Sequence, residues 1–400
     1  MNENTYSVLT INGGSSSIKF SLYQCGTQMR QYLSGKIERI GLPDTTLTFN
    51  DTLGDQQGTL AVDAADVDSV INFLLDWLAQ TIDITQIKGV GHRVVHGMNH
   101  TQPELVSKEL LEELHRISTY DPEHLPLEIK LIEIFRQRYP NLPQVACFDT
   151  AFHAGMPRVA KLLPIPRRFD VMGIQRYGFH GLSYSYLMQA LANTAGTNAA
   201  QGKVILAHLG NGASLAAVHN GQSIDTSMGF TPTGGLPMGT RTGDLDPGTA
   251  WFLMQNENLT PQQFNHLINH ESGLLGVSES SADMRDLLAL AATDVRAAEA
   301  VELFCYQTRK WIGSYAAALG GLDTLVFSGG IGENAAVIRQ RICSGLAFLG
   351  IVLDAARNAH NEDIVSADTS RVMIRVIKTN EELEIAKAVC QLLALRTGKK

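Results

Sequence analysis

The sequence predicts an α/β protein, and three observations support that prediction. Short apolar strands recur along the chain, at residues 6–12, 18–23, 145–148, 204–209 and 325–327. Amphipathic helical stripes separate these strands. Glycine-rich turns follow several of the strands, and the 36 glycines of the sequence exceed the usual share. Strands and helices mixed throughout a chain are typical of the α/β class.

Three helices are indicated most clearly. Asp66 is placed to cap a helix whose apolar residues repeat every three to four positions from Val67 to Leu78. An alanine-rich run from about residue 296 to residue 319 ends at Gly320-Gly321, where a helix is expected to stop. A further stripe is formed by Leu110, Leu111, Leu114 and Ile117.

Two strand–turn–strand units are similar to each other. The first spans residues 6–23, with a turn after Asn12, and the second spans residues 204–218, with the turn Gly210-Asn211-Gly212. Asn220-Gly221 then gives a strong hairpin signal. The pair indicates a duplicated domain, and the alternative is two unrelated hairpins. No proline- or serine-rich linker separates the halves, so a compact hinge is expected near Asp149-Thr150.

Composition narrows the class of protein. A chain of 400 residues favours two or three domains. The net charge of −8 argues against a nucleic-acid partner or an anionic membrane surface, because both recruit basic patches. Five cysteines without a C-x-x-C motif argue against a disulfide framework or a structural zinc site and favour a cytoplasmic location. We expect neither a signal peptide nor a membrane span.

Glycine-rich turns are the main chemical signal. The Walker A, Rossmann, zincin and α/β-hydrolase signatures do not occur. Three turns remain at strand ends: Asn12–Ser17, Gly210–Gly212 and Gly329–Asn334. Backbone N–H groups in such turns can hold phosphate oxygens. One such turn alone is most often only a turn, whereas three in one chain indicate a polyphosphate ligand.

Charged residues near these turns extend the hypothesis. Lys19 alternates with Ile18 and Phe20, so its side chain is expected on the opposite face, toward a phosphate; the alternative is a solvated lysine on an edge strand. Arg93 and Arg241 lie in glycine-bounded segments, where a guanidinium can bind a carboxylate or phosphate. The alternative for each is a structural ion pair.

Two further residues have both a chemical and a structural interpretation. Asp149 ends the strand at residues 145–148, a frequent position for a site residue in open α/β folds, and the alternative is a helix cap. His180 stands beside Gly181, although a lone histidine is usually structural.

Taken together, the motifs resemble the acetate kinase family, within the superfamily of acetate and sugar kinases, Hsp70 and actin. The resemblance covers essentially the whole chain in order, and nine ordered motifs are far more specific than one. The matching stretches are Asn12–Phe20, Gly91–Gly97, Val145–His153, Arg176–Gly181, Ala207–Ser214, Asp225–Pro247, Glu271–Gly276, Ser328–Asn334 and Thr379–Glu382.

The resemblance implies two duplicated ribonuclease-H-like domains of the actin-like ATPase type, with an interdomain cleft. The implied N-terminal domain comprises residues 1–149 plus about 384–400. The C-terminal, nucleotide-binding domain comprises residues 150–383. The resemblance also implies a homodimer that uses ATP or ADP as co-substrate, with Mg²⁺ as the metal and Mn²⁺ as a possible substitute.

The resemblance also implies roles for single residues. Asn12 and Glu381 resemble the magnesium-site residues. Ser15, Ser17 and Lys19 would lie near the transferring phosphoryl group. The catalytic set would comprise Arg93, Asp149, His180 and Arg241, and acceptor contacts would come from Arg93, Val95, His124, Phe179 and Pro232. The nucleotide segments would be His208, Leu209, Gly210, Asn211 and Gly212; Asp283, Met284 and Arg285; and Gly330, Ile331, Gly332, Glu333 and Asn334.

The implied reaction is the reversible, in-line transfer of a phosphoryl group from ATP to acetate, giving acetyl phosphate. A carboxylic acid has a pKa about three units below neutral, so the acceptor is already ionised and no general base is required. The task is to bring two anions together, which needs cations and positioning. Asp149 is then better interpreted as orienting an arginine or a metal than as a base.

Departures from the family pattern concern the acceptor side. The family usually has P-L-H-N-P where this chain has Pro122-Glu123-His124-Leu125-Pro126. It usually has H-G-G-E at His96–Asn99 and T-S-H at Leu182-Ser183-Tyr184. A propionate kinase or another short-chain carboxylate kinase is therefore the alternative.

More distant alternatives are a pyrophosphate-using relative and a nucleotide-gated, actin-like binding protein. The retained Gly329–Asn334 segment argues against the first. Arg93, Arg241 and His180 argue against the second.

Overall fold

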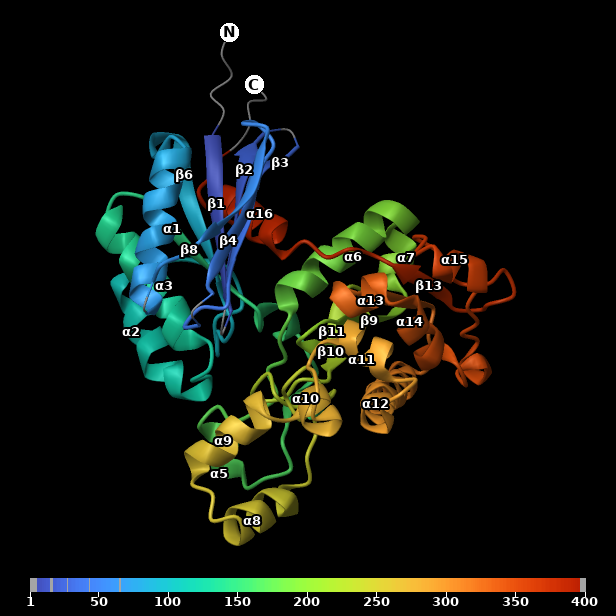
Figure 1. Ribbon diagram of the computed structural model, residues 1–400. Coiled ribbons are helices and arrows are strands. Elements are labelled where there is room, and N and C mark those ends of the chain that lie inside the picture. Colours follow the sequence, from blue (N-terminus) through green and yellow to red (C-terminus); the bar gives the residue numbers. More distant parts are fainter. Residues whose placement is uncertain (1–5, 15–16, 27, 43, 65, 396–400) are drawn as a thin grey trace. The chain divides into compact units, whose positions relative to one another are not determined.

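The computed structural model describes residues 6–14, 17–26, 28–42, 44–64 and 66–395, which fall into two compact units (Figure 1). Unit 1 is drawn from residues 1–151 and 380–400, and unit 2 from residues 152–379. Each unit is built around one β-sheet with helices packed on it.

The sheet of unit 1 has the strand order β5-β4-β3-β2-β1-β6-β8-β7. β1 pairs antiparallel with β2 and parallel with β6, and β6 pairs parallel with β8. The strands are β1 (Tyr6–Gly14), β2 (Ser17–Cys25), β3 (Arg30–Glu38), β4 (Thr46–Asp51), β5 (Gln56–Ala61), β6 (Ile87–Val94), β7 (Glu104–Leu105) and β8 (Gln144–Phe148).

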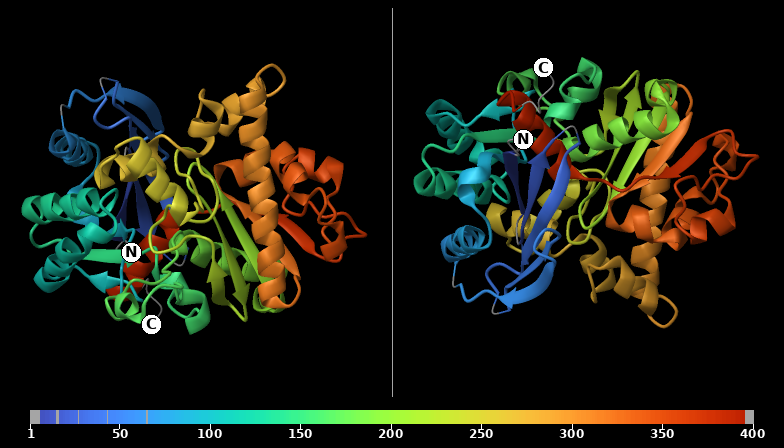
Figure 2. Two further views of the ribbon diagram at one scale, coloured as in Figure 1. Left: turned by 90° about the horizontal axis from the view of Figure 1, so that it is seen from below. Right: turned by 90° about the horizontal axis from the view of Figure 1, so that it is seen from above.

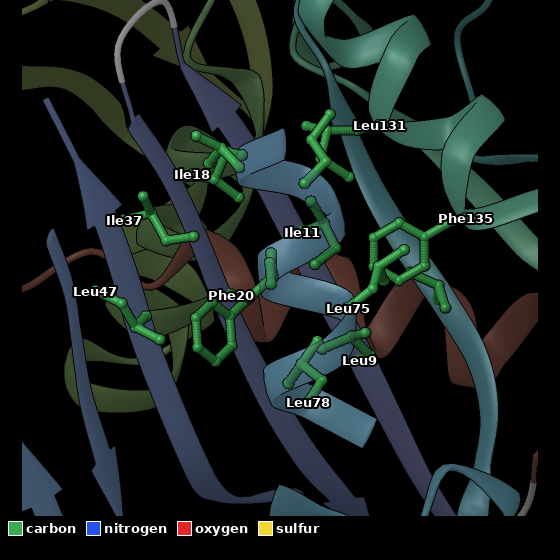
Figure 3. Close-up of a cluster of buried hydrophobic side chains, with 14 of the residues drawn as sticks. Leu9, Ile11, Ile18, Phe20, Ile37, Leu47, Leu75, Leu78, Leu131 and Phe135 are labelled. Atoms are coloured by element: carbon green, nitrogen blue, oxygen red, sulfur yellow. The ribbon is translucent and has the colours of Figure 1, made fainter. Parts of the chain in front are cut away.

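Helices α1 (Val67–Thr81) and α3 (Leu125–Arg138) cover one face of this sheet, and α2 (Lys108–Ile117) packs against α3. Figure 3 shows the core that results, in which apolar side chains of β1 to β4 meet those of the two helices. Asp66 starts α1, as expected, by accepting a hydrogen bond from the N–H of Ser69.

Helix α16 (Glu381–Leu392), the last helix of the chain, packs on the opposite face of the same sheet (Figure 1). The close approach depends on two glycines of β6. A Cβ atom on Gly91 would lie 2.3 Å from the side chain of Ile385, and one on Gly89 would lie 2.5 Å from that of Leu393. The helix therefore contacts the backbone of the central strands directly.

The sheet of unit 2 has the order β11-β10-β9-β12-β13. Its strands are β9 (Lys203–Leu209), β10 (Ala213–His219), β11 (Gln222–Thr226), β12 (Thr324–Ser328) and β13 (Met373–Val376). The helices are α4 (Arg158–Lys161), α5 (Arg167–Val171), α6 (Gly181–Ala195), α7 (Thr197–Gln201), α8 (Pro247–Asn256), α9 (Pro261–His270), α10 (Gly273–Ser278), α11 (Met284–Leu290), α12 (Val295–Leu319), α13 (Gly329–Asn334), α14 (Ala336–Cys343) and α15 (Ala355–Ala359).

Helices flank this second sheet as well. Side chains of α6, including Leu187 and Leu191, pack against Val204 and Leu206 of β9. The long helix α12 runs beside β10, as the views of Figure 2 show in orange and green. It ends at Gly320, as the sequence predicts.

The two sheets share one topology. In unit 1 the central order is β3-β2-β1-β6-β8, and in unit 2 it is β11-β10-β9-β12-β13. In both, the first three strands are antiparallel and the last two add in parallel. The expected duplication of an α/β, ribonuclease-H-like unit is therefore confirmed, and the alternative of two unrelated hairpins is wrong. Among helices of the described part of the chain, none has both the length and the apolar character needed to cross a bilayer.

Candidate functional site

In unit 1, an amide and a carboxylate meet where β1 approaches the start of α16. Asn12 donates a hydrogen bond from Nδ2 to Oε2 of Glu381, at 3.1 Å. Lys19 of β2 stands opposite Asn12 in the strand register. Burial raises the pKa of the neighbouring Glu382, the charge of Glu381 raises it further, and Lys19 lowers it. These four residues form one charged cluster.

The orientation of Lys19 agrees with the sequence prediction. Ile18 and Phe20 are buried in the core, whereas Lys19 between them is exposed on the other face. β2 lies between β1 and β3, so Lys19 is solvent-exposed, as the alternative also expects, but it does not lie on an edge strand.

Asn12 and Glu381 fit one kind of metal site. Magnesium prefers oxygen ligands, keeps several waters, and is often held by one or two carboxylates together with substrate phosphates. An amide and a carboxylate suit that pattern. Within the residues that the structure describes, no three His, Cys, Asp or Glu side chains gather so that they could hold a metal. The residues thus fit a cation that shares its ligands with a phosphate, and not an all-protein metal cage.

Arg93 of β6 is anchored from two sides. Its Nε and Nη2 atoms donate to Oδ2 of Asp149, at 2.9 and 2.6 Å. Its Nη1 atom donates to the carbonyl oxygen of Gly13, at 3.2 Å. Asp149 directly follows β8, and its N–H donates to the carbonyl of Val94, so the carboxylate is itself held in place. Asp149 therefore orients the guanidinium group next to the end of β1.

Glu128 of α3 completes this arrangement and was not singled out by the sequence analysis. Its Oε2 atom accepts from the N–H of Val95 at 2.8 Å, and its Oε1 atom lies 3.4 Å from Nη1 of Arg93. Burial raises the pKa of Glu128 to about 8, against the opposing effect of Arg93. Burial lowers the pKa of Arg93, but the carboxylates around it outweigh burial, so the net direction is upward.

A sequence signal for Glu128 did exist. Helix α3 buries Leu125, Ile129 and Ile132, and Glu128 falls on the same helical face. A carboxylate within an apolar stripe needs a buried partner. That signal identifies a partnered glutamate, but it does not identify Arg93 as the partner.

The residues of unit 1 predicted to contact the acceptor lie close to Arg93 and Glu128. Val95 is buried, and its backbone binds Glu128. His124 begins α3 and pairs with Asp121, with 3.0 Å between Nδ1 and Oδ1. Ser17 pairs with Gly14 at the start of β2, whereas Ser15 lies outside the described residues.

In unit 2, two stacked histidines lie between the start of α6 and β9. The rings of His180 and His208 are 4.3 Å apart and nearly parallel. Nδ1 of His180 hydrogen-bonds Oγ of Ser214 at 2.8 Å, and Nδ1 of His208 hydrogen-bonds Oγ of Ser183 at 2.8 Å. With its Nδ1 atom occupied, the His180 ring is oriented so that Nε2 faces the backbone at Gly212.

Arg241 approaches the same glycine. A Cβ atom on Gly212 would lie 3.4 Å from Nε2 of His180 and 3.8 Å from Nη1 of Arg241. Nη1 of Arg241 also donates to the carbonyl of Pro232, at 3.2 Å. The structure thus brings a histidine, an arginine and a glycine turn together, an arrangement suited to an anion.

The loop that carries Arg241 is fixed by backbone contacts. The N–H of Gly239 donates to the carbonyl of Asn211 at 3.0 Å. Gly273 has φ +61°, and a Cβ atom there would lie 2.1 Å from the carbonyl oxygen of Met238 and 2.6 Å from that of Arg241. Only glycine allows this approach.

The two glycine-rich turns predicted in unit 2, Gly210–Gly212 and Gly329–Asn334, lie next to each other. Gly329 has φ +75°, and a Cβ atom on it would lie 2.7 Å from the carbonyl of Leu209. The carboxylate of Glu333 accepts from the N–H of Gly329 at 2.9 Å and from that of Thr379 at 3.1 Å. Glu333 therefore holds the β12–α13 turn in shape beside the turn Gly210–Gly212.

Arg339 of α14 binds the backbone of α13, just after the same turn, and the sequence analysis did not predict this role. It is fully buried and donates to the carbonyls of Gly332 and Glu333, at 2.8 and 3.0 Å. Its other N–H groups bind Asn358 and Asn361. Its sequence neighbours give no signal for this role, because every partner outside α13 comes from a segment near α15.

Of the other residues predicted to belong to the site in unit 2, some are exposed and others are buried. Arg285 is 89% exposed and pairs with Asp283, which caps α11, whereas Met284 is buried. Ala282, just before them, has its carbonyl 3.3 Å from a Cβ position on Gly239. Phe179 and Pro232 are buried residues whose carbonyls accept from His153 and Arg241.

The chain is similar to known kinases over nearly its whole length. The model of the acetokinase family matches residues 7–387. A propionate kinase of Citrobacter rodentium is 44% identical over 399 residues, which is 98% of each chain. An acetate kinase of Rhodopseudomonas palustris is 42% identical over 391 residues, covering 96% of this chain and 98% of the relative.

Solved structures give the same result. A propionate kinase from Francisella tularensis has a TM-score of 0.90 at 37% identity, over 96% of this chain and 98% of its own. An acetate kinase from Porphyromonas gingivalis has a TM-score of 0.87 at 35% identity, over 97% of this chain and 100% of its own. This chain therefore belongs to the acetokinase family of kinases, and its duplicated α/β fold is the fold of solved acetate and propionate kinases.

Proposed function

We propose that this chain transfers the terminal phosphoryl group of ATP to acetate, forming acetyl phosphate, and runs the reverse reaction with ADP. The observation that carries the proposal is the anchored Arg93, fixed by Asp149 and Glu128 close to the Asn12–Glu381 pair. A preorganised guanidinium stabilises a carboxylate and the charge that develops on a transferring phosphoryl group. Membership of the family over residues 7–387 supports the same reaction class.

No proton has to be removed from the acceptor. Acetate is ionised at neutral pH, because carboxylic acids have pKa values near 4. Both oriented N–H groups of Arg93 bind Oδ2 of Asp149. We therefore assign Asp149 to positioning Arg93 and not to general-base catalysis.

Cations carry the main catalytic task in unit 1. Asn12 and Glu381 would hold a magnesium ion, which when bound neutralises charge on the nucleotide phosphates. Mn²⁺, another cation that accepts oxygen ligands, is expected to substitute. Lys19 adds a positive charge to the same cluster.

Unit 2 would bind the nucleotide. The adjacent turns Gly210–Gly212 and Gly329–Asn334 offer backbone N–H groups to its phosphates. His180 and Arg241 would stabilise the transferring group, since both lie against Gly212. The surface segment Asp283–Arg285 would contact the nucleoside. A homodimer in the cytoplasm completes the proposal.

Propionate is a second candidate acceptor. Two relatives named propionate kinase are 44% and 43% identical to this chain, and a relative named acetate kinase is 42% identical. One methylene group in an apolar pocket changes kcat/KM by roughly 10- to 200-fold. The ratio of kcat/KM for the two acids therefore decides between them.

The test is an assay of acyl phosphate formation. Purified protein is incubated with ATP, magnesium and either acid, and hydroxylamine converts any acyl phosphate to a hydroxamate. We expect product that disappears when EDTA removes the cation and returns with added Mg²⁺ or Mn²⁺. If neither acid gave hydroxamate, the proposal would be lost, and ATP binding without product would favour a nucleotide-gated binding protein.

A further inference from the structure

Two cysteines far apart in the sequence meet inside unit 1. Cys25 ends β2, and Cys390 lies in the last turns of α16, which runs beside that strand (Figure 1). Their Sγ atoms are 2.7 Å apart. A disulfide bond needs about 2.05 Å between the sulfur atoms, so a small movement would join them. All five cysteines of the chain are free thiols in the structure.

We propose that Cys25 and Cys390 are a reversible modification site, at which a peroxide oxidises the two thiols to a disulfide that fastens α16 to β2. The proposal does not rest on the proposed function, because it concerns two thiols outside the groups assigned to phosphoryl transfer.

The two sulfur atoms differ in environment. Cys25 is 5% exposed, whereas Cys390 is partly exposed and within reach of a small oxidant. The hydrogen bond between them lowers the pKa of Cys390 and raises that of Cys25. Cys390 is therefore the thiol of the pair that ionises more readily, and the thiolate is the reactive form.

The chemistry balances with hydrogen peroxide as oxidant. The Cys390 thiolate attacks one peroxide oxygen, the O–O bond breaks, and a sulfenic acid and hydroxide form. The Cys25 sulfur then attacks the Cys390 sulfur, the S–O bond breaks, and water leaves with the Cys25 proton. Two electrons pass from the thiols to the peroxide, so the sum is two thiols and one peroxide giving one disulfide and two waters. A dithiol reverses the step by exchange.

The position of the bond suggests its consequence. β2 already holds the start of α16, because Tyr23 donates to Oδ1 of the N-cap residue Asn380 at 3.0 Å. A bond at Cys390 would hold the other end of the helix. Since the helix begins with Glu381, the oxidised form should keep the Asn12–Glu381 contact under conditions in which the reduced form loses it.

Peptide mapping and thiol counting test the site directly. Fully reduced protein is treated with a small excess of hydrogen peroxide, quenched, denatured and titrated. We expect five thiols to fall to three, and trypsin to release residues 20–30 linked to residues 388–396. The melting temperature should rise by about 5 °C or more, because the bond closes a loop of more than 360 residues, and dithiothreitol should restore the starting value.

Variants separate the site from general oxidation. Cys25→Ser and Cys390→Ser should each show neither the linked peptides nor the rise in melting temperature. Cys343→Ser is the matched control, which removes a buried thiol of unit 2 and should fall from four thiols to two. The proposal is overturned if wild type keeps five thiols, if the linked peptides contain other cysteines, or if melting rises equally in Cys25→Ser.

Discussion

Arg241 is held in place by a hydrogen bond and lies beside the turn Gly210–Gly212, which is proposed to bind phosphate. Its Nη1 atom binds the carbonyl of Pro232, and the same atom lies 3.8 Å from a Cβ position on Gly212. A preorganised donor to developing charge is worth about 3–4 kcal/mol. Arg241→Ala should therefore lower kcat roughly 10²- to 10³-fold with little change in melting temperature.

The control for this variant is Arg296→Ala. Arg296 is 51% exposed and pairs with Glu279 on the surface, so its loss should change kcat less than about twofold. Near-normal turnover of Arg241→Ala in the hydroxamate assay would show that this arginine is only structural.

Glu123 tests the acceptor side, where the family usually has leucine. A carboxylate about 6 Å from the acceptor carboxylate would cost roughly 2–3 kcal/mol. Glu123 is partly exposed just before the N-cap of α3, so we expect it to point away from the acceptor, toward solvent or a basic partner. Glu123→Leu should then change the KM for acetate and propionate less than about threefold. A large fall in KM for both acids would show that Glu123 faces the acceptor.

The buried His153 should make the protein less stable as the pH falls below about 6.5. Its Nε2–H donates to the carbonyl of Phe179, its Nδ1 accepts from Ser223, and burial lowers its pKa from 6.5 to about 4. The folded state therefore disfavours the protonated form. The stabilisation is complete above pH 6.5 and is lost as pH falls toward 4, by about 3 kcal/mol.

The measurement is the free energy of unfolding between pH 7 and pH 4, in wild type and His153→Gln. His92 has the same shift and remains in the variant, so a pH dependence persists, but the fall in the free energy of unfolding should be smaller than in wild type by about 3 kcal/mol. An unchanged slope in His153→Gln would show that His153 does not contribute.

At the scale of elements, local sequence patterns predicted several of the helices, strands and turns correctly. The apolar stripes after Asp66 and from Leu110 to Ile117 correspond to buried faces of α1 and α2. Asn220-Gly221 forms the tight connection between β10 and β11. These features depend on spacing and on turn chemistry within a few residues, which a sequence displays directly.

Features that depend on distant partners could not be predicted in this way. The nearly fully exposed β5 has no alternating apolar pattern, and β4 alone determines its pairing. Arg93 meets Asp149 across 56 positions and Glu128 across 35, and Arg339 binds groups 6 to 22 positions away. The residue types at a site were therefore predictable, whereas the contacts that orient them were not.

The loop carrying Arg241 offers a test at the element scale. Gly273→Ala would place a Cβ atom 2.1 Å from the carbonyl of Met238 and impose a positive φ on alanine. We expect a cost of about 1–3 kcal/mol in stability and, since Arg241 must move, a loss of kcat/KM of at least about tenfold.

Gly313→Ala in the middle of α12 is the matched control. A Cβ atom there meets nothing within 4 Å, so alanine should leave activity unchanged and gain up to about 1 kcal/mol in stability. Equal activity of the Gly273→Ala and Gly313→Ala proteins would contradict the importance of this contact.

At the scale of the whole molecule, the last helix of the chain belongs to the unit that the beginning of the chain forms. The helix α6 follows β8 of unit 1 in sequence but packs on the sheet of unit 2, and α16 follows β13 of unit 2 but packs on the sheet of unit 1. Unit 1 is therefore assembled from both ends of the chain, whereas unit 2 is continuous.

Removing α16 should affect the two units differently. Ile385, Ala386 and Val389 are fully buried, and exposing them would cost roughly 4–6 kcal/mol, comparable to the entire stability of many domains. In a chain that ends at Thr379, amide hydrogen exchange should become fast in β1 and β6 and stay slow in β9 and β12. Equal protection of β1 and β6 in the full and shortened chains would contradict this.

The same connectivity determines the order in which the parts of unit 1 are synthesised on the ribosome. Strands β1 to β8 emerge first, but the helix that covers the second face of their sheet is made last. Translating residues 152–379 takes roughly 10 to 45 s at 5–20 residues per second. During that interval the glycine-lined surface of β6 stays uncovered, while unit 2 has its whole sequence available before translation ends. The nascent N-terminal unit is thus the part of this kinase that most needs protection by chaperones.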